Sequence, residues 1–169
     1  MNNMYFSRLD MLWKIFSEVP DATAYIRGSS THPRVKGVSQ FYQLAHGVLM
    51  VVEVMGLPTT QDACKKGIHA LHIHSGESCT GNVKDAFANA GMHYNPTECK
   101  HPFHAGDLPP LFENEGYAMM VFFTNRFRVN EVIGKTIIVH ENIDDFTSQP
   151  SGNAGAKIAC GEIRPIMIR

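Results

Sequence analysis

Short apolar runs separated by turn residues make up most of the chain after residue 20. The runs are ATAYIRG, VKGVSQFYQL, HGVLMVVEVMG, GIHALHIH, GYAMMVFF and KTIIVHE. Gly-, Pro- and Asn-containing segments such as GSSTHP, GLPTTQDACKKG, ENEG and RVNEVIG separate them. Each run has the length and residue types of a β-strand. Because no helical pattern alternates with the runs, they predict an all-β antiparallel sandwich or barrel.

One helical pattern precedes the strands. Phe6, Leu9, Trp13 and Phe16 recur at helical spacing, and Pro20 ends the pattern. This spacing predicts a short amphipathic helix that covers one edge or end of the core.

Composition and charge exclude several classes of protein. The 169 residues suit one domain, and 44% hydrophobic with 18% charged residues is typical of a globular protein. The net charge of −1 argues against a nucleic-acid partner, and no apolar run is long enough to span a membrane. Arg8, Asp10 and Lys14 interrupt the N-terminal apolar residues, so that segment is not a convincing secretory signal. A cytoplasmic location is therefore expected.

Histidine is the most informative residue type. Six of the nine histidines lie between Gly67 and Asp107. Side chains alternate between the faces of a strand, so His72 and His74 point to the same face and can share a metal ion. His69 points to the opposite face with the apolar residues, which predicts a buried, hydrogen-bonded role for it.

Two long segments without a strand pattern, 75–110 and 141–157, hold or adjoin the other candidate ligands. Loops of this length in a compact domain are usually functional. His101, His104 and Asp107 are spaced by three residues, and His93 and His140 add two more imidazoles. Three histidines with a carboxylate suit zinc, and an all-imidazole set suits copper, if one histidine serves both. His32 and His46 fit better as scattered loop residues.

Taken together, these motifs resemble those of the copper–zinc superoxide dismutases. The matching segments are GIHALHIH, GMHYNP, KH, HAGDLP, IGKTIIVHENIDD and SGNAGAKIACGEI, in the order in which the family has them. The resemblance covers roughly residues 22–163. It implies a flattened eight-stranded antiparallel Greek-key barrel, an immunoglobulin-like sandwich, with two long functional loops. By comparison, residues 1–20 form an N-terminal extension and residues 21–169 the barrel domain.

The resemblance also assigns roles to individual residues. It implies one copper and one zinc per chain, with His93 bridging the two metals. It gives Asp144 the role of linking a ligand of each metal, and it pairs Cys79 with Cys160 in a disulfide. Cys64 and Cys99 are expected to be free thiols, with a second disulfide between them as the alternative. The implied ligands are His72, His74, His93 and His140 for copper, and His93, His101, His104 and Asp107 for zinc.

The implied activity is dismutation of superoxide, with His93 and Lys157 as catalytic residues. Lys157 stands where the family usually has arginine, and the segment between His140 and Cys160 is short. The spacing around Cys79 is closer to that of bacterial members. A homodimer is expected, and a copper chaperone is a candidate partner. Two alternatives stay open: a non-enzymatic relative that binds metal or acts as a copper chaperone, and a structural module that uses zinc alone.

Overall fold

A computed structural model describes residues 7–60, 62 and 67–167. It begins with helix α1 (Arg8–Ser17), which confirms the predicted N-terminal helix. Ser7 caps this helix: its hydroxyl oxygen accepts the Asp10 amide, and the Asp10 carboxylate accepts the Ser7 amide. The helical spacing predicted that Trp13 lies on the buried apolar face of this helix. That prediction is wrong, because the Trp13 side chain is 71% exposed.

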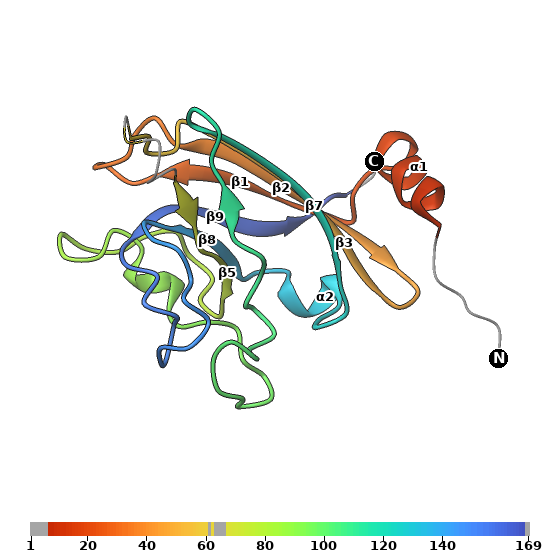
Figure 1. Cartoon of the computed structure of the whole chain (residues 1–169). Coiled ribbons are helices and arrows are strands. Elements are labelled where there is room, and N and C mark those ends of the chain that lie inside the picture. The colour runs from red at the N-terminus through yellow and green to blue at the C-terminus, as the bar shows by residue number, and fades with distance from the viewer. Residues whose placement is uncertain (1–6, 61, 63–66, 168–169) are drawn as a thin grey trace.

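The all-β class is confirmed. The described part of the chain contains nine strands, all paired antiparallel, in a curled seven-stranded sheet ordered β5-β8-β9-β1-β2-β3-β7 and a two-stranded sheet β4-β6 (Figure 1). The strands are β1 (Ala22–Gly28), β2 (Lys36–Leu44), β3 (Gly47–Met55), β4 (Ile68–His69), β5 (Leu71–His74), β6 (Leu111–Phe112), β7 (Tyr117–Thr124), β8 (Thr136–His140) and β9 (Lys157–Pro165).

The run GIHALHIH forms two strands instead of one. Ala70 separates β4 from β5, and its amide and carbonyl bond to Asn142 and His140. The chain therefore passes from the small sheet to the large one at Ala70, and counting β4 and β5 as one strand gives the expected eight. The strand patterns did not include β6 or β9, and the segment RVNEVIG contains a short helix, α2 (Val129–Val132), as well as a turn.

The core lies inside the curled sheet. Alternate residues of the strands fill it, among them Ile26, Phe41, Val52, Leu71 and Ile137, which are all nearly inaccessible. Outside the sheet, Met11 and Ile15 of α1 pack against a second apolar cluster. That cluster consists of Tyr42, Leu44, Leu49 and Val51. The helix thus covers part of the outer face of β2 and β3.

The two long segments gather away from α1, on the other side of the sheet (Figure 1). Segment 75–110 contains one 3-10 turn, Ala88–Ala90, and segment 141–156 contains no strand or helix. None of the described helices is both long and apolar enough to cross a membrane. The division into an extension and a barrel domain stays a prediction.

Candidate metal centre

Four histidines from three parts of the chain converge beside β5. His72 and His74 lie on β5, His140 ends the neighbouring strand β8, and His93 lies in the long segment. An isolated bridge pairs His74 with His93, so the long segment runs alongside β5 there. One nitrogen of each ring lies within 4.8 Å of one nitrogen of each other ring, and all four residues are buried. We call His72, His74, His93 and His140 the four-histidine group.

A second group shares His93 with the first. One ligand atom of each member again lies within 4.8 Å of one atom of each other member, and every member is buried. His93 Nδ1 lies 2.7 Å from the Asp107 carboxylate, and His101 Nδ1 lies 3.1 Å from it. This mixed group consists of His93, His101, His104 and Asp107. The structure therefore brings together every residue that the resemblance implied as a metal ligand.

Asp144 joins the two groups. Its Oδ2 lies 2.8 Å from His72 Nε2, and its Oδ1 lies 2.8 Å from His101 Nε2. Burial opposes ionisation, but the hydrogen bonds that it accepts from His72, the Phe146 amide and His101 outweigh this and lower the pKa of its carboxyl. Gly152 permits this approach: its φ is +66°, and an added Cβ would lie 1.9 Å from Asp144 Oδ1.

The outer hydrogen bonds decide which ring nitrogens face inward. Asp144 occupies Nε2 of His72 and of His101, and the Gly91 carbonyl accepts from His74 Nδ1 at 2.8 Å. His74 Nε2 then lies 3.3 Å from His140 Nε2. Within the two ligand groups, three buried ring nitrogens have no hydrogen-bond partner: His72 Nδ1, His93 Nε2 and His101 Nδ1. Buried unpaired nitrogens that converge in this way suit metal ions, because a metal supplies the missing partner.

Burial also favours the uncharged form of His72, His74 and His140. It lowers the pKa of His140 to about 3, and nearby His72 adds to the effect. Burial and the neighbouring His140 place the pKa of His74 well below its usual value, and burial lowers that of His72. Neutral imidazole is the form that binds metal, so these rings are ready to act as ligands at neutral pH.

A cavity of about 700 Å³ leads to the four-histidine group. His74, His93 and His140 line it, together with Lys84 and Lys157. Lys157 begins β9 directly opposite His140 in the β8–β9 ladder, which places it beside the group as the resemblance implied.

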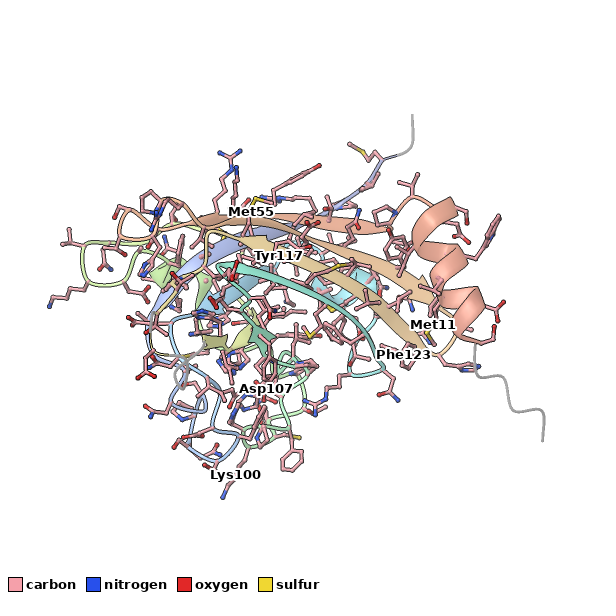
Figure 2. The ribbon with its side chains drawn as sticks, turned by 45° about the horizontal axis from the view of Figure 1, so that its top comes forward. Met11, Met55, Lys100, Asp107, Tyr117 and Phe123 are labelled. Carbon is pink, nitrogen blue, oxygen red and sulfur yellow. A yellow bond between two sulfur atoms is a disulfide. The ribbon has the colours of Figure 1, made fainter. Side chains whose placement is uncertain are left out.

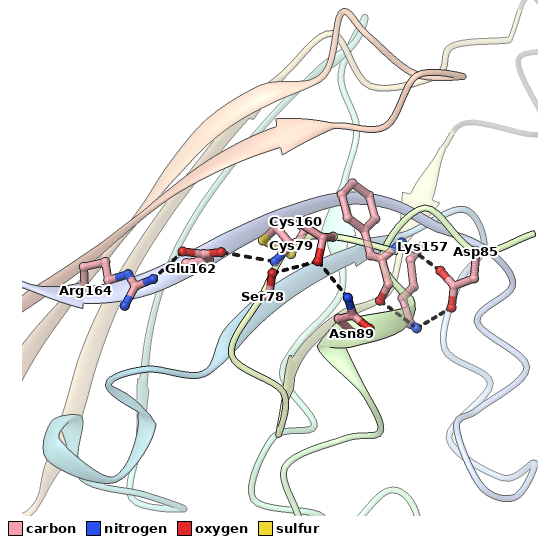
Figure 3. The surroundings of a disulfide bond; sticks show 10 residues. Ser78, Cys79, Asp85, Asn89, Lys157, Cys160, Glu162 and Arg164 are labelled. Atoms are coloured by element: carbon pink, nitrogen blue, oxygen red, sulfur yellow. Dashed lines mark hydrogen bonds and ion pairs between the residues drawn. A yellow bond between two sulfur atoms is a disulfide. The ribbon is translucent and has the colours of Figure 1, made fainter. Parts of the chain in front are cut away.

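The structure shows a partner of Lys157 that the sequence did not. Lys157 Nζ lies 2.7 Å from the Asp85 carboxylate and 3.2 Å from the Phe87 carbonyl (Figure 3). The side chain of Lys157 is only 15% exposed. Its charge at the cavity wall is therefore partly neutralised. Asp85 precedes Lys157 by 72 residues, and no local pattern marks the pair.

The disulfide between Cys79 and Cys160 is confirmed (Figure 3). It ties the segment that carries Asp85 and His93 to β9, and Phe87 and Ala90 pack against Ile138 beside it. The cysteines are 81 residues apart, so the chain-entropy model gives a stabilisation of about 4–5 kcal/mol. Cys99 is a free, exposed thiol as expected, and Cys64 lies outside the described residues.

The structural role predicted for His69 is confirmed. It is 3% exposed, and its Nδ1 lies 3.0 Å from the carbonyl oxygen of His140. Because a carbonyl only accepts, Nδ1 is the donor. His69 therefore supports the backbone of one member of the four-histidine group without belonging to it.

A curled antiparallel β-sheet with two adjoining buried ligand groups, joined by one histidine, defines a two-metal β-barrel protein. The copper/zinc superoxide dismutase family model matches residues 35–163, and the chain therefore belongs to that family. The family implies copper and zinc, and the two groups are consistent with one site for each.

Individual relatives agree with this assignment. The chain is 30% identical to superoxide dismutase [Cu-Zn] 2 of Aquifex aeolicus, over 85% of this chain and 88% of the relative. It is 31% identical to the superoxide dismutase [Cu-Zn] of Deinococcus radiodurans, over 79% of each chain. It is also 30% identical to the copper chaperone for superoxide dismutase of Rattus norvegicus, over 84% of this chain and 52% of that protein.

Proposed function

We propose that the protein catalyses dismutation of superoxide, in which two superoxide anions and two protons give dioxygen and hydrogen peroxide. The observation that carries this proposal is the sharing of His93 by two buried ligand groups, of which the four-histidine group lines a cavity. Family membership supports an oxidoreductase that acts on superoxide.

The four-histidine group would hold copper and the mixed group zinc. All-imidazole sites suit copper, and three imidazoles with a carboxylate suit zinc. Bound copper would supply the one-electron oxidation of one superoxide and reduction of the next, whereas zinc has no redox chemistry.

The protein's own residues would orient the ligands and move a proton. His93 Nδ1 lies 2.7 Å from the Asp107 carboxylate of the mixed group, and Nε2 belongs to no hydrogen bond, so Nε2 is the nitrogen left for the four-histidine group. We infer that Nε2 holds one of the two protons that reach the product peroxide, the other coming from solvent, while Nδ1 keeps the ring in place. Lys157 at the cavity wall would attract the anion.

Metal content and activity of two variants test the assignment. Reconstituted protein should bind about one copper and one zinc per chain, because the two ligand sets share only His93. His140→Ala should abolish dismutation and retain most of the zinc, and Asp107→Ala should lose zinc first. Full activity with both metals in either variant would show that the ligand assignment is wrong.

The same measurements distinguish the alternatives. Copper and zinc without dismutation would indicate a metal-binding or chaperone-like relative, and zinc alone would indicate a structural module. The presence of all four histidines together favours the enzyme.

We also propose a homodimer in the cytoplasm, with a copper chaperone as a candidate partner. Strand β7 is at one edge of the seven-stranded sheet and exposes Tyr117, Met119, Val121 and Phe123 on alternate positions. Figure 2 shows Tyr117 and Phe123 at the two ends of this strand. A second copy could cover such an apolar surface. Sedimentation of the native protein and of Met119→Glu tests this, because the substitution should favour the monomer.

A further inference from the structure

A single arginine outside both ligand groups holds the segment that carries the mixed group. Arg126 Nη1 lies 3.0 Å from the carbonyl oxygens of Pro102 and His104 and 3.2 Å from that of Asp107. His104 and Asp107 are members of the mixed group. Arg126 follows β7, so it approaches this segment from another part of the fold.

Three carbonyl oxygens that converge on one point repel one another unless a donor lies between them. The guanidinium supplies both the hydrogens and a positive charge, and hydrogen bonds from a charged donor are stronger than neutral ones. One nitrogen has two hydrogens, so the three oxygens share them. Arg126 therefore helps to fix the backbone conformation at His104 and Asp107, together with the bridge from Asp107 to His72.

Apart from Arg126, this segment is held by an isolated bridge between Asp107 and His72 and by scattered hydrogen bonds, without a continuous ladder. Residues 101–107 belong to no helix or named strand. Their main-chain hydrogen bonds include those from the Phe103 amide to Lys100 and from the Gly106 amide to Tyr94. None of the three carbonyls that Arg126 binds belongs to His72, His74 or His140. Any effect of Arg126 should therefore fall first on the mixed group.

We propose that Arg126 is a positioning residue for zinc, which pre-orients His104 and Asp107 by binding their carbonyl oxygens. The inference rests on the proposed assignment of zinc to the mixed group. Groups that orient metal ligands typically contribute 10- to 100-fold to metal affinity. Arg126→Gln should weaken zinc binding within that range, by about tenfold, and change copper affinity by less than a factor of about three.

The experiment is competition of zinc-loaded protein with a chromophoric chelator, alongside copper titration. Arg128→Gln is the matched control, because Arg128 is also exposed, lies two residues away and carries the same charge. It should leave both affinities unchanged. Cobalt(II) bound in place of zinc adds a spectroscopic readout: its visible absorption should shift in Arg126→Gln and not in Arg128→Gln.

The outcomes separate this proposal from the proposed function. If Asp107→Ala weakens zinc binding but Arg126→Gln does not, the role of Arg126 is wrong and the zinc assignment stands. If Asp107→Ala has no effect either, the assignment itself fails. Equal loss of zinc and copper affinity in Arg126→Gln would indicate a general structural role and overturn the proposal. Should Arg126→Gln not fold, Arg126→Lys keeps the charge on a shorter side chain and should weaken zinc selectively by a smaller factor.

Discussion

The two ligand groups are built in different ways. Three members of the four-histidine group lie on β5 and β8, whose backbones are fixed by a continuous ladder of hydrogen bonds. The mixed group lies entirely on segment 93–107, which has no such ladder: isolated bridges join His93 and Asp107 to β5, and Asp144 and Arg126 add further contacts. The strands thus impose one geometry directly, whereas the other combines isolated bridges to β5 with contacts from side chains that are remote in sequence.

The buried histidines on the strands predict that the metal-free protein becomes less stable in acid. A histidine whose pKa is depressed on folding stabilises the fold fully above the unfolded pKa of about 6.5, and this contribution is lost as pH falls toward the folded pKa. For His140 the window runs from about 6.5 down to about 3. Each such histidine contributes a slope of about 1.4 kcal/mol per pH unit within its window.

Urea unfolding of the metal-free protein at several pH values measures this slope. The free energy of unfolding should fall steadily as the pH decreases through the window. His140→Gln should make the fall shallower, and His46→Gln, at an exposed loop position, should not. A free energy that stays constant over this range would contradict neutral burial of the group.

Asp144 contacts a histidine of each ligand group, so its removal should weaken metal binding at both. Asp144→Ala leaves Nε2 of His72 and of His101 without their acceptor, so we expect a 10- to 100-fold loss of metal affinity. Zinc should be lost more than copper, because β5 still fixes the backbone of His72. Chelator competition for each metal measures the two losses. An equal loss would show that the strand ladder gives the four-histidine group no advantage.

The same difference explains what the sequence could predict. Alternation along GIHALHIH places His72 and His74 on one face and separates His69, because strand parity is a local property. The break at Ala70 arises from its bonds to residues 140 and 142, which local periodicity does not contain. Three other features also join segments that are distant in sequence, so local patterns could not predict them. They are the Lys157–Asp85 pair, the close approach of Gly152 to Asp144, and the contacts of Arg126. The role of Asp144 came only from the family resemblance.

Directly after β6, outside both ligand groups, lies a carboxylate whose burial should cost stability. Glu113 is 6% exposed; its Oε1 accepts the Gly116 amide, whereas its Oε2 has no hydrogen-bond partner. Glu113→Gln keeps the acceptor at Oε1 and removes the charge. We expect stabilisation of about 1 kcal/mol, because an unpaired buried charge is costly.

Chemical unfolding of the metal-free protein measures this gain, with Glu115→Gln as an exposed control two residues away. The control should change stability by less than about 0.5 kcal/mol. Destabilisation by Glu113→Gln would contradict an unpaired carboxylate and indicate that its charge has a partner in solution.

The smallest expected effect concerns Lys157, at the cavity wall beside the four-histidine group. Arginine offers a planar fork of donors, whereas lysine is a compact point charge. Both attract an anion from a distance, so Lys157→Arg should raise the dismutation rate by only a factor of a few, less than the tenfold change that about 1.4 kcal/mol would give. Lys157→Glu should slow the reaction more, because it reverses the charge and faces Asp85. Added salt should slow the natural protein, since charges are screened over about 8–10 Å at physiological ionic strength.

Pulse radiolysis at two ionic strengths measures these rates. Lys14→Glu on α1 is the matched control, because it makes the same change in charge on a helix that lies away from the loops (Figure 1). Asp85→Asn tests how far the ion pair with Asp85 weakens the attraction of superoxide by Lys157. Without the negative partner, Lys157 should attract superoxide more strongly, and the rate at low salt should rise. An unchanged rate in Lys157→Glu would show that this lysine does not guide the substrate. Lys84, which lines the same cavity, would then be the next cation to test.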